Sequence, residues 1–232
     1  MNIIRNEKLI KRNARIGGIA NLLGFGIMIA GFLYAWQGNQ TTEVGIWLWV
    51  ALLVGFAAAQ IGIYFTNRFG RKPRLDEQLD QSLKGLGGDF TLYHYTSPVP
   101  HLLVGPAGVW VLLPFYQVGT FSFVKNRWRQ RSTGFLHSYM RIFGQESIGR
   151  PEIEAGAEVE SVLRKFKKID LDAEWPEVKA ALVFLSERAE VEPGDSPIPA
   201  MLSKKLKDFL RKQAKDTPLP KTQIEKINTA LA

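Results

Sequence analysis

The chain has 232 residues, with 30 Lys and Arg, 22 Asp and Glu and no Cys. Without cysteine it can have no disulfide framework, no thiolate nucleophile and no Cys-based zinc or iron–sulfur site. Most of the net charge of +8 comes from residues 1–74, which hold nine basic and two acidic residues. The remainder is nearly neutral, so the basic balance does not by itself indicate a nucleic-acid-binding protein.

Two apolar segments dominate the first third of the chain. Residues 16–36 and 45–65 are 21 residues each without a charge, and as helices each would span about 31 Å, close to the thickness of a bilayer core. The basic residues flank this pair in 1–15 and 66–74, and the linker 37–44 has none. By the positive-inside rule we expect a two-pass hairpin in the cytoplasmic membrane with both termini in the cytosol. The alternative is a cleaved signal peptide, but the first segment is long for one and no A-x-A site follows it.

Small residues recur every four positions in both segments, a pattern that allows close helix packing and self-association in lipid. The alternative is that Gly and Ala are simply common in membrane helices. The residues concerned are Ala20, Gly24, Gly26, Ala30, Ala51, Gly55 and Ala59. Asn21 and Gln60 fall at similar depths in an antiparallel hairpin, so we predict a hydrogen bond between their amides.

The rest of the chain has the pattern of an α/β domain with a mixed sheet. We expect a basic linker at 66–74, a domain at 75–195 and C-terminal helices at 196–232. The predicted order is a helix from 75, strands at 90–96, 101–104 and 109–115, an edge strand at 120–125, a helix from 151, a strand at 178–185 and helices from 199 and 222.

The stretch from His101 to Leu112 (HLLVGPAGVWVL), together with this element order, resembles the nuclease-related domain (NERD) family. The resemblance implies a restriction-endonuclease-like fold with an αβββαβ core. In that family an Asp precedes the His-Leu segment and a Glu-x-Lys triplet ends the next strand. These positions fall on Pro100, Leu113 and Phe115.

Pro, Leu and Phe cannot hold Mg²⁺ or stabilise charge on a phosphate. The resemblance therefore implies a pseudo-nuclease with no catalytic residues, no metal and no cofactor, rather than an enzyme. The alternative is a metal-dependent nuclease with a relocated site that uses Asp89, Glu77 or Glu146.

One basic segment is a candidate nucleic-acid-binding site. If residues 125–131 are extended, four basic side chains share one face, and Trp128 could stack on a base. They are Lys125, Arg127, Arg129 and Arg131. The alternative is a charged edge strand that prevents aggregation. The lysine-rich helix at 203–215 likewise suits either anionic lipid or solvent.

Three local patterns carry no function. Ser122 and Lys125 match a serine–lysine motif without its partners, and Gly85 to Gly88 precede a strand rather than a helix. His94, His101 and His137 have no metal-site spacing and are expected to be packing residues. The sequence thus predicts a membrane-anchored binding or tethering module for DNA or RNA. The alternative function is a scaffold for protein partners.

Overall fold

The computed structural model describes residues 1–37, 42–131, 148–170 and 174–231. They form two compact units: a helical unit, Glu7–Arg74, and an α/β unit that combines Met1–Asn6 with Leu75–Ala232. The expected boundary at residues 15 and 16 is therefore wrong, because α1 runs unbroken through it. The expected boundary at 195 and 196 is also absent, because the C-terminal helices pack into the α/β core.

The helical unit consists of α1 (Glu7–Gln37) and α2 (Thr42–Phe65), which continues into a π-helical turn, η1 (Thr66–Gly70). Both helices are long and apolar enough to cross a membrane. Only 11% and 17% of the residues in their most apolar stretches are buried, whereas a core helix of a soluble protein would be mostly buried. Their large side chains, such as Leu22, Trp36 and Leu53, are exposed.

Glycines form the contact between α1 and α2. A Cβ on Gly24 would lie 2.6 Å from the backbone N of Ala59 and 2.7 Å from the O of Gly55. A Cβ on Gly31 would lie 2.5 Å from that of Ala51. The small-residue prediction is thus correct for Gly24, Gly55 and Ala59, but not for Gly26, whose Cβ would meet nothing within 4 Å.

The predicted amide pair between Asn21 and Gln60 does not form. Asn21 Nδ2 instead donates to Thr66 Oγ1 at 3.1 Å, while Gln60 is exposed. The reason is that Asn21 lies against the backbone of Gly62, where a Cβ would come within 2.3 Å of its Oδ1. Asn21 thus meets α2 at Gly62, two residues beyond Gln60.

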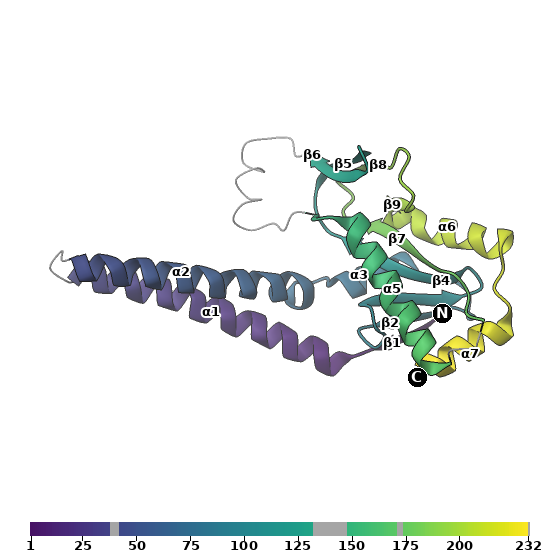
Figure 1. Cartoon of the computed structure of the whole chain (residues 1–232), viewed down its shortest axis with the longest axis horizontal. Helices are drawn as coiled ribbons and strands as arrows, with labels where there is room; N and C mark the ends of the chain where they lie inside the picture. Colours follow the sequence, from purple (N-terminus) through teal and green to yellow (C-terminus); the bar gives the residue numbers. More distant parts are fainter. Residues whose placement is uncertain (38–41, 132–147, 171–173, 232) are drawn as a thin grey trace. The chain divides into compact units, whose positions relative to one another are not determined.

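The main sheet of the α/β unit has the order β1-β2-β3-β4-β7-β9 (Figure 1). β2 to β4 are antiparallel neighbours, and β7 is parallel to β4 through the crossover helix α5. Its elements are β1 (Asn2–Arg5), α3 (Leu75–Ser82), β2 (Thr91–His94), β3 (His101–Gly105), β4 (Gly108–Phe115), α5 (Pro151–Ile169), β7 (Val178–Phe184) and β9 (Ala200–Leu202). The fold class is therefore α/β with a mixed sheet, as expected.

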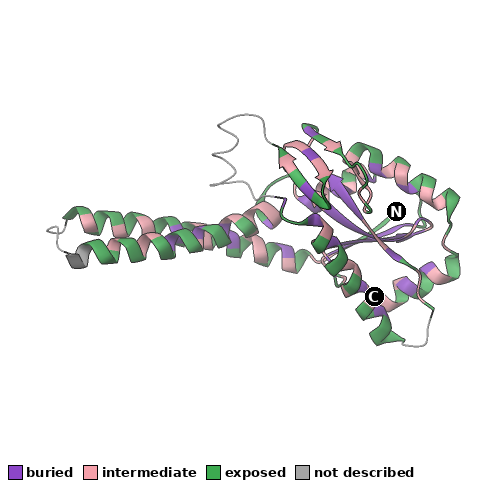
Figure 2. Ribbon diagram, turned by 45° about the horizontal axis from the view of Figure 1, so that its top comes forward, coloured by how far each residue is buried: buried purple, intermediate pink, exposed green. Residues whose placement is uncertain are grey.

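Helices cover both faces of this sheet, and Figure 2 shows its strands as the main buried region. The strands are buried because alternate residues of β4 pack on opposite faces. Val111 and Leu113 pack with α5 and α7 (Lys221–Leu231). Trp110 and Leu112 pack with α3 and α6 (Ser203–Asp216). The continuous apolar run at 109–115 is thus a strand buried on both sides.

A second, three-stranded sheet has the order β6-β5-β8, with β5 (Gly119–Val124), β6 (Arg127–Arg131) and β8 (Ala189–Glu192). The sequence placed the strand at 120–125 on an edge, but β5 is the central strand of this separate sheet. Lys125 and Asn126 form the two-residue turn to β6, both with positive φ of 53° and 61°. This backbone is that of the turns preferred in tight hairpins.

Candidate functional site

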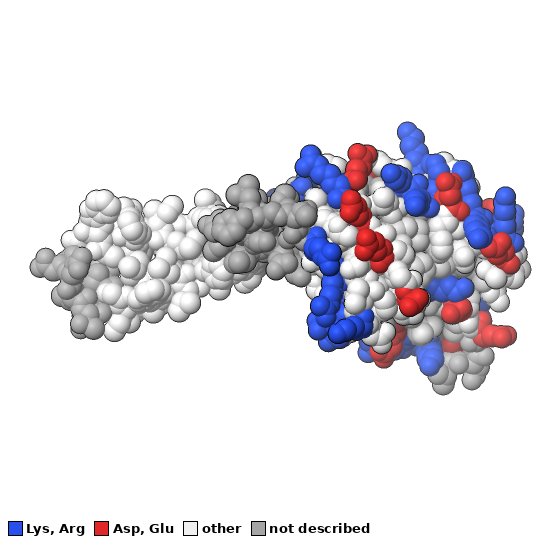
Figure 3. All heavy atoms as spheres, turned by 90° about the horizontal axis from the view of Figure 1, so that it is seen from above, with Lys and Arg blue, Asp and Glu red and all other residues white. Residues whose placement is uncertain are grey.

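The predicted basic row lies on β6, the edge strand of the small sheet. Arg127, Arg129 and Arg131 are exposed and alternate along the strand, and Lys125 stands in the exposed turn before it. The three arginines therefore share one face, as predicted from their spacing, whereas Lys125 lies in the turn and outside the extended segment. Figure 3 shows that positive side chains in this view are interspersed with negative ones, so the unit has no single continuous basic face there.

Trp128 lies on the opposite face of β6 and is only 4% exposed. Its ring packs against Phe123 and Phe184, with centroids 5.7 and 6.1 Å away. The ring is thus part of the core between the two sheets. The expectation that Trp128 stacks on a base is wrong, because stacking requires an accessible ring face.

The positions that correspond to a nuclease site come together on the α5 face of the main sheet. Leu102 pairs with Val111, so continuing this register places Pro100 beside Leu113. Leu113 and Phe115 are buried at 3% and 7% exposure, and Phe115 stacks on Phe184 with centroids 5.4 Å apart. Apolar packing therefore occupies the place where polar ligands would be needed.

The alternative carboxylates do not meet at that place. Asp89 precedes β2, which begins beside the end of β3, whereas Pro100 precedes the start of β3. Asp89 is thus at the opposite end of the strands. Glu77 lies on α3, which covers the other face of the sheet, and Glu146 is outside the described residues.

A buried polar network, which sequence reasoning missed, connects β1, α3, β2 and β3. Arg5 forms ion pairs with Asp76, at 2.9 Å from Nε to Oδ2, and with Asp80. His94 Nε2 lies 3.0 Å from Asp80 Oδ1, and the Nδ1 atoms of His94 and His101 are 2.8 Å apart. Both histidines and Asp76 are almost fully buried.

The hydrogen-bond directions in this network follow from the acceptor groups. An ionised carboxylate can only accept, so the Nε2 of His94 carries the hydrogen that faces Asp80. In a neutral ring the Nδ1 of His94 then accepts, and the Nδ1 of His101 donates to it. Through Arg5, the network joins β1 to α3. The spacing of Asp76 and Asp80, four residues apart, was the only sign of this network in the sequence.

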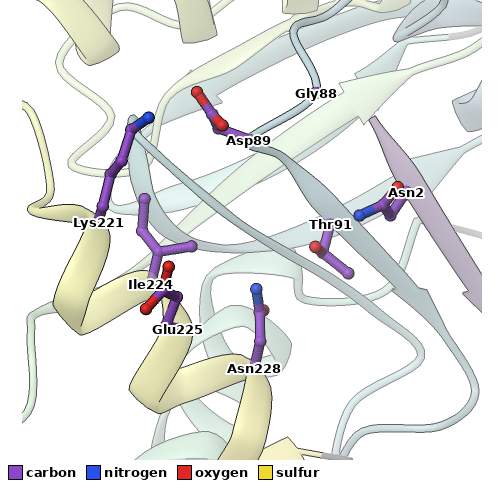
Figure 4. A pocket seen from close by; sticks show the side chains of 8 residues that line it. All are labelled: Asn2, Gly88, Asp89, Thr91, Lys221, Ile224, Glu225 and Asn228. Atoms are coloured by element: carbon purple, nitrogen blue, oxygen red, sulfur yellow. The ribbon is translucent and has the colours of Figure 1, made fainter.

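A small pocket lies between β1, the start of β2 and α7 (Figure 4). Its volume is about 180 Å³. Its polar lining residues are Asn2, Asp89, Thr91, Lys221, Glu225 and Asn228. No sequence pattern predicts this pocket, because its residues come from three separate parts of the chain.

Among the residues that the structure describes, no group of three or more His, Asp or Glu side chains could hold a metal ion. In α6, Lys207 and Arg211 donate to the backbone O atoms of Lys84 and Gly85, at 3.2 Å each. These two basic residues therefore bind the end of α3. No family model, curated protein or solved structure matches the chain significantly.

Proposed function

We propose that the chain is a membrane-anchored tether that holds nucleic acid at the cytosolic face through the arginine row of β6. The single observation that carries the proposal is the presence, in one chain, of two outward-facing apolar helices and an exposed row of three arginines. The first feature suits lipid and the second suits phosphate.

The connectivity supports a hairpin with both ends on the same side of the membrane. Residues up to Asn6 and from Leu75 onward belong to one α/β unit, which β1 joins by parallel pairing to β2. A folded unit that contains the chain both before and after the two helices favours one side of a bilayer for both ends. The excess of Lys and Arg in the adjoining segments 1–15 and 66–74 favours the cytosol as that side.

The core topology supports a restriction-endonuclease-like fold without nuclease chemistry. When β5 and β6, which belong to the small sheet, are left out, the order α3-β2-β3-β4-α5-β7 is αβββαβ. The two residues that stand at the Glu-x-Lys positions are buried and apolar. Replacing buried charges by well-packed apolar groups often stabilises a fold. The same scaffold thus serves as a binding platform in this proposal.

Phosphate contact, rather than base reading, is the binding mode that fits the arginines. Alternate residues on a strand are about 6.8 Å apart, so each arginine can reach a different phosphate. Because Trp128 is buried, its ring is not available for stacking. We therefore expect binding that depends strongly on salt and little on sequence.

The test is fluorescence anisotropy with the full-length protein in detergent micelles and a labelled single-stranded oligonucleotide, repeated over a salt series. Replacing Arg127, Arg129 and Arg131 by Gln should weaken binding. It should also make the slope of log K against log salt concentration shallower by about 2, because each of the three lost phosphate contacts contributes about 0.7 to that slope. The matched control replaces Arg164, Lys165 and Lys168, which are exposed on α5.

Equal losses in the two triple variants would mean that only the overall charge matters, and would refute a site on β6. A flat anisotropy curve for the wild-type protein at low salt would remove nucleic acid as the partner. The protein scaffold would then be the function to test, by cross-linking at the membrane.

A further inference from the structure

The pocket between β1, β2 and α7 combines one basic residue, Lys221, two acidic residues, Asp89 and Glu225, and several neutral hydrogen-bonding groups. Figure 4 shows the Lys221 amine and the Asp89 carboxylate facing each other across its opening. No ion pair joins them among the described residues. Both charges are therefore available to a ligand, and they are of opposite sign.

Thr91 is the most buried polar side chain in this pocket. It is 5% exposed, and its hydroxyl has no hydrogen-bond partner in the part of the chain that the structure describes. The hydroxyl oxygen is not among the enclosed side-chain atoms that lack a partner, so it is accessible. It lies at the pocket wall (Figure 4), where an occupant with a polar atom can bond to it.

Asn228 is held in one orientation by a residue behind the pocket. The Tyr93 hydroxyl donates to Asn228 Oδ1 at 3.0 Å, which turns the amide nitrogen toward the pocket. Burial raises the pKa of Tyr93, so the phenol remains a donor and this orientation is kept. Asn228 thus offers an N–H donor beside the Thr91 hydroxyl.

We propose that this pocket binds a small zwitterion, a molecule with a carboxylate and an ammonium group such as a free amino acid. Lys221, Asn228 and Thr91 supply donors for the carboxylate, and Asp89 accepts from the ammonium group. The pocket is about 180 Å³, below the roughly 300 Å³ at which sites for larger ligands begin. This inference does not rest on nucleic-acid binding.

Isothermal titration calorimetry of the full-length protein in detergent, with glycine, acetate and methylamine as probes, tests the proposal. Glycine should bind saturably and more tightly than either probe that carries only one of its charges. Asp89→Asn should weaken glycine binding about tenfold, a loss of one charge-assisted contact, and leave acetate binding unchanged. Thr91→Val should weaken the binding of both.

Glu187→Gln, at an exposed acid outside the pocket, is the matched control and should change nothing. Thermal unfolding of each variant establishes that it is folded. The proposal is overturned if glycine gives no saturable heat at millimolar concentration. Equal affinities for glycine and acetate, or unchanged glycine binding in folded Asp89→Asn, would also overturn it.

Discussion

Arg5 and Asp76 form an ion pair of 2.9 Å across the point where the chain leaves and re-enters the α/β unit. Arg5 ends β1 just before α1 begins, and Asp76 stands in the first turn of α3, just after the helical unit ends. One contact therefore holds together both connections to the two apolar helices.

Removing Arg5 should destabilise the α/β unit strongly, because Asp76 is fully buried and would lose its compensating charge. We expect Arg5→Ala to lower the free energy of unfolding by about 3 kcal/mol, measured by urea denaturation in detergent. Arg164→Ala breaks an exposed pair with Glu160 and should cost less than about 0.5 kcal/mol. Similar losses in the two variants would contradict the assignment.

Adding a methyl group to Gly24 should separate α1 from α2, because its Cβ would lie 2.6 Å from a backbone nitrogen of α2. We expect Gly24→Ala to cost about 1–3 kcal/mol and to lower the temperature at which the helical circular dichroism is lost. Gly26→Ala enters open space and serves as the control. A lower unfolding temperature for Gly26→Ala alone would show that the contact face is misassigned.

The hydrogen bond between Asn21 and Thr66 should give a measurable coupling energy. In a double-mutant cycle of Asn21→Leu and Thr66→Val we expect about 0.6 kcal/mol, the average for such bonds in membranes. Gln60→Leu should not reduce stability, because Gln60 is exposed and makes no bond to Asn21. Coupling of Asn21 to Gln60 instead would restore the pair expected from the sequence.

Tyr93 should make the protein sensitive to alkaline pH. Burial raises the pKa of its phenol above the ordinary value of 10.0, so above that pH the unfolded chain loses this proton first. The unfolded state then binds fewer protons than the native state, and stability falls as pH rises through the native pKa. Tyr93→Phe should reduce this alkaline loss in urea denaturation at high pH; an identical pH profile would contradict it.

Periodicity predicted the elements of the α/β unit because their apolar spacing depends on local geometry. The runs at 101–104, 109–115 and 178–185 are strands, and Pro151 opens α5, as expected. The assignment of the strand at 120–125 to the edge failed, since sheet membership depends on pairing partners distant in sequence, here β6 and β8. The alternation of side chains along 127–131 was correctly predicted. The burial of the face that carries Trp128 was not, because it results from contact with Phe184 of β7.

The polar network and the pocket could not be predicted, because both use residues from β1. Asn2 and Arg5 come from a segment that composition grouped with the basic flank of the first apolar helix. A four-residue strand gives almost no periodic signal, and its pairing with β2 spans the whole helical unit. The buried positions of Asp76 and Asp80 could not be predicted either, because their partner Arg5 lies about 70 residues earlier in the chain.

The position of β1 imposes an order on biosynthesis. β1 is translated before the two apolar helices, yet its partner β2 follows them, so the sheet edge stays incomplete until both helices have been made. Closing so long a loop is slow, because its entropy cost precedes any gain from pairing. During that interval the exposed edge of β2 can pair with other strands. A tag fused ahead of Asn2 would affect this step, the pairing of β1 with β2.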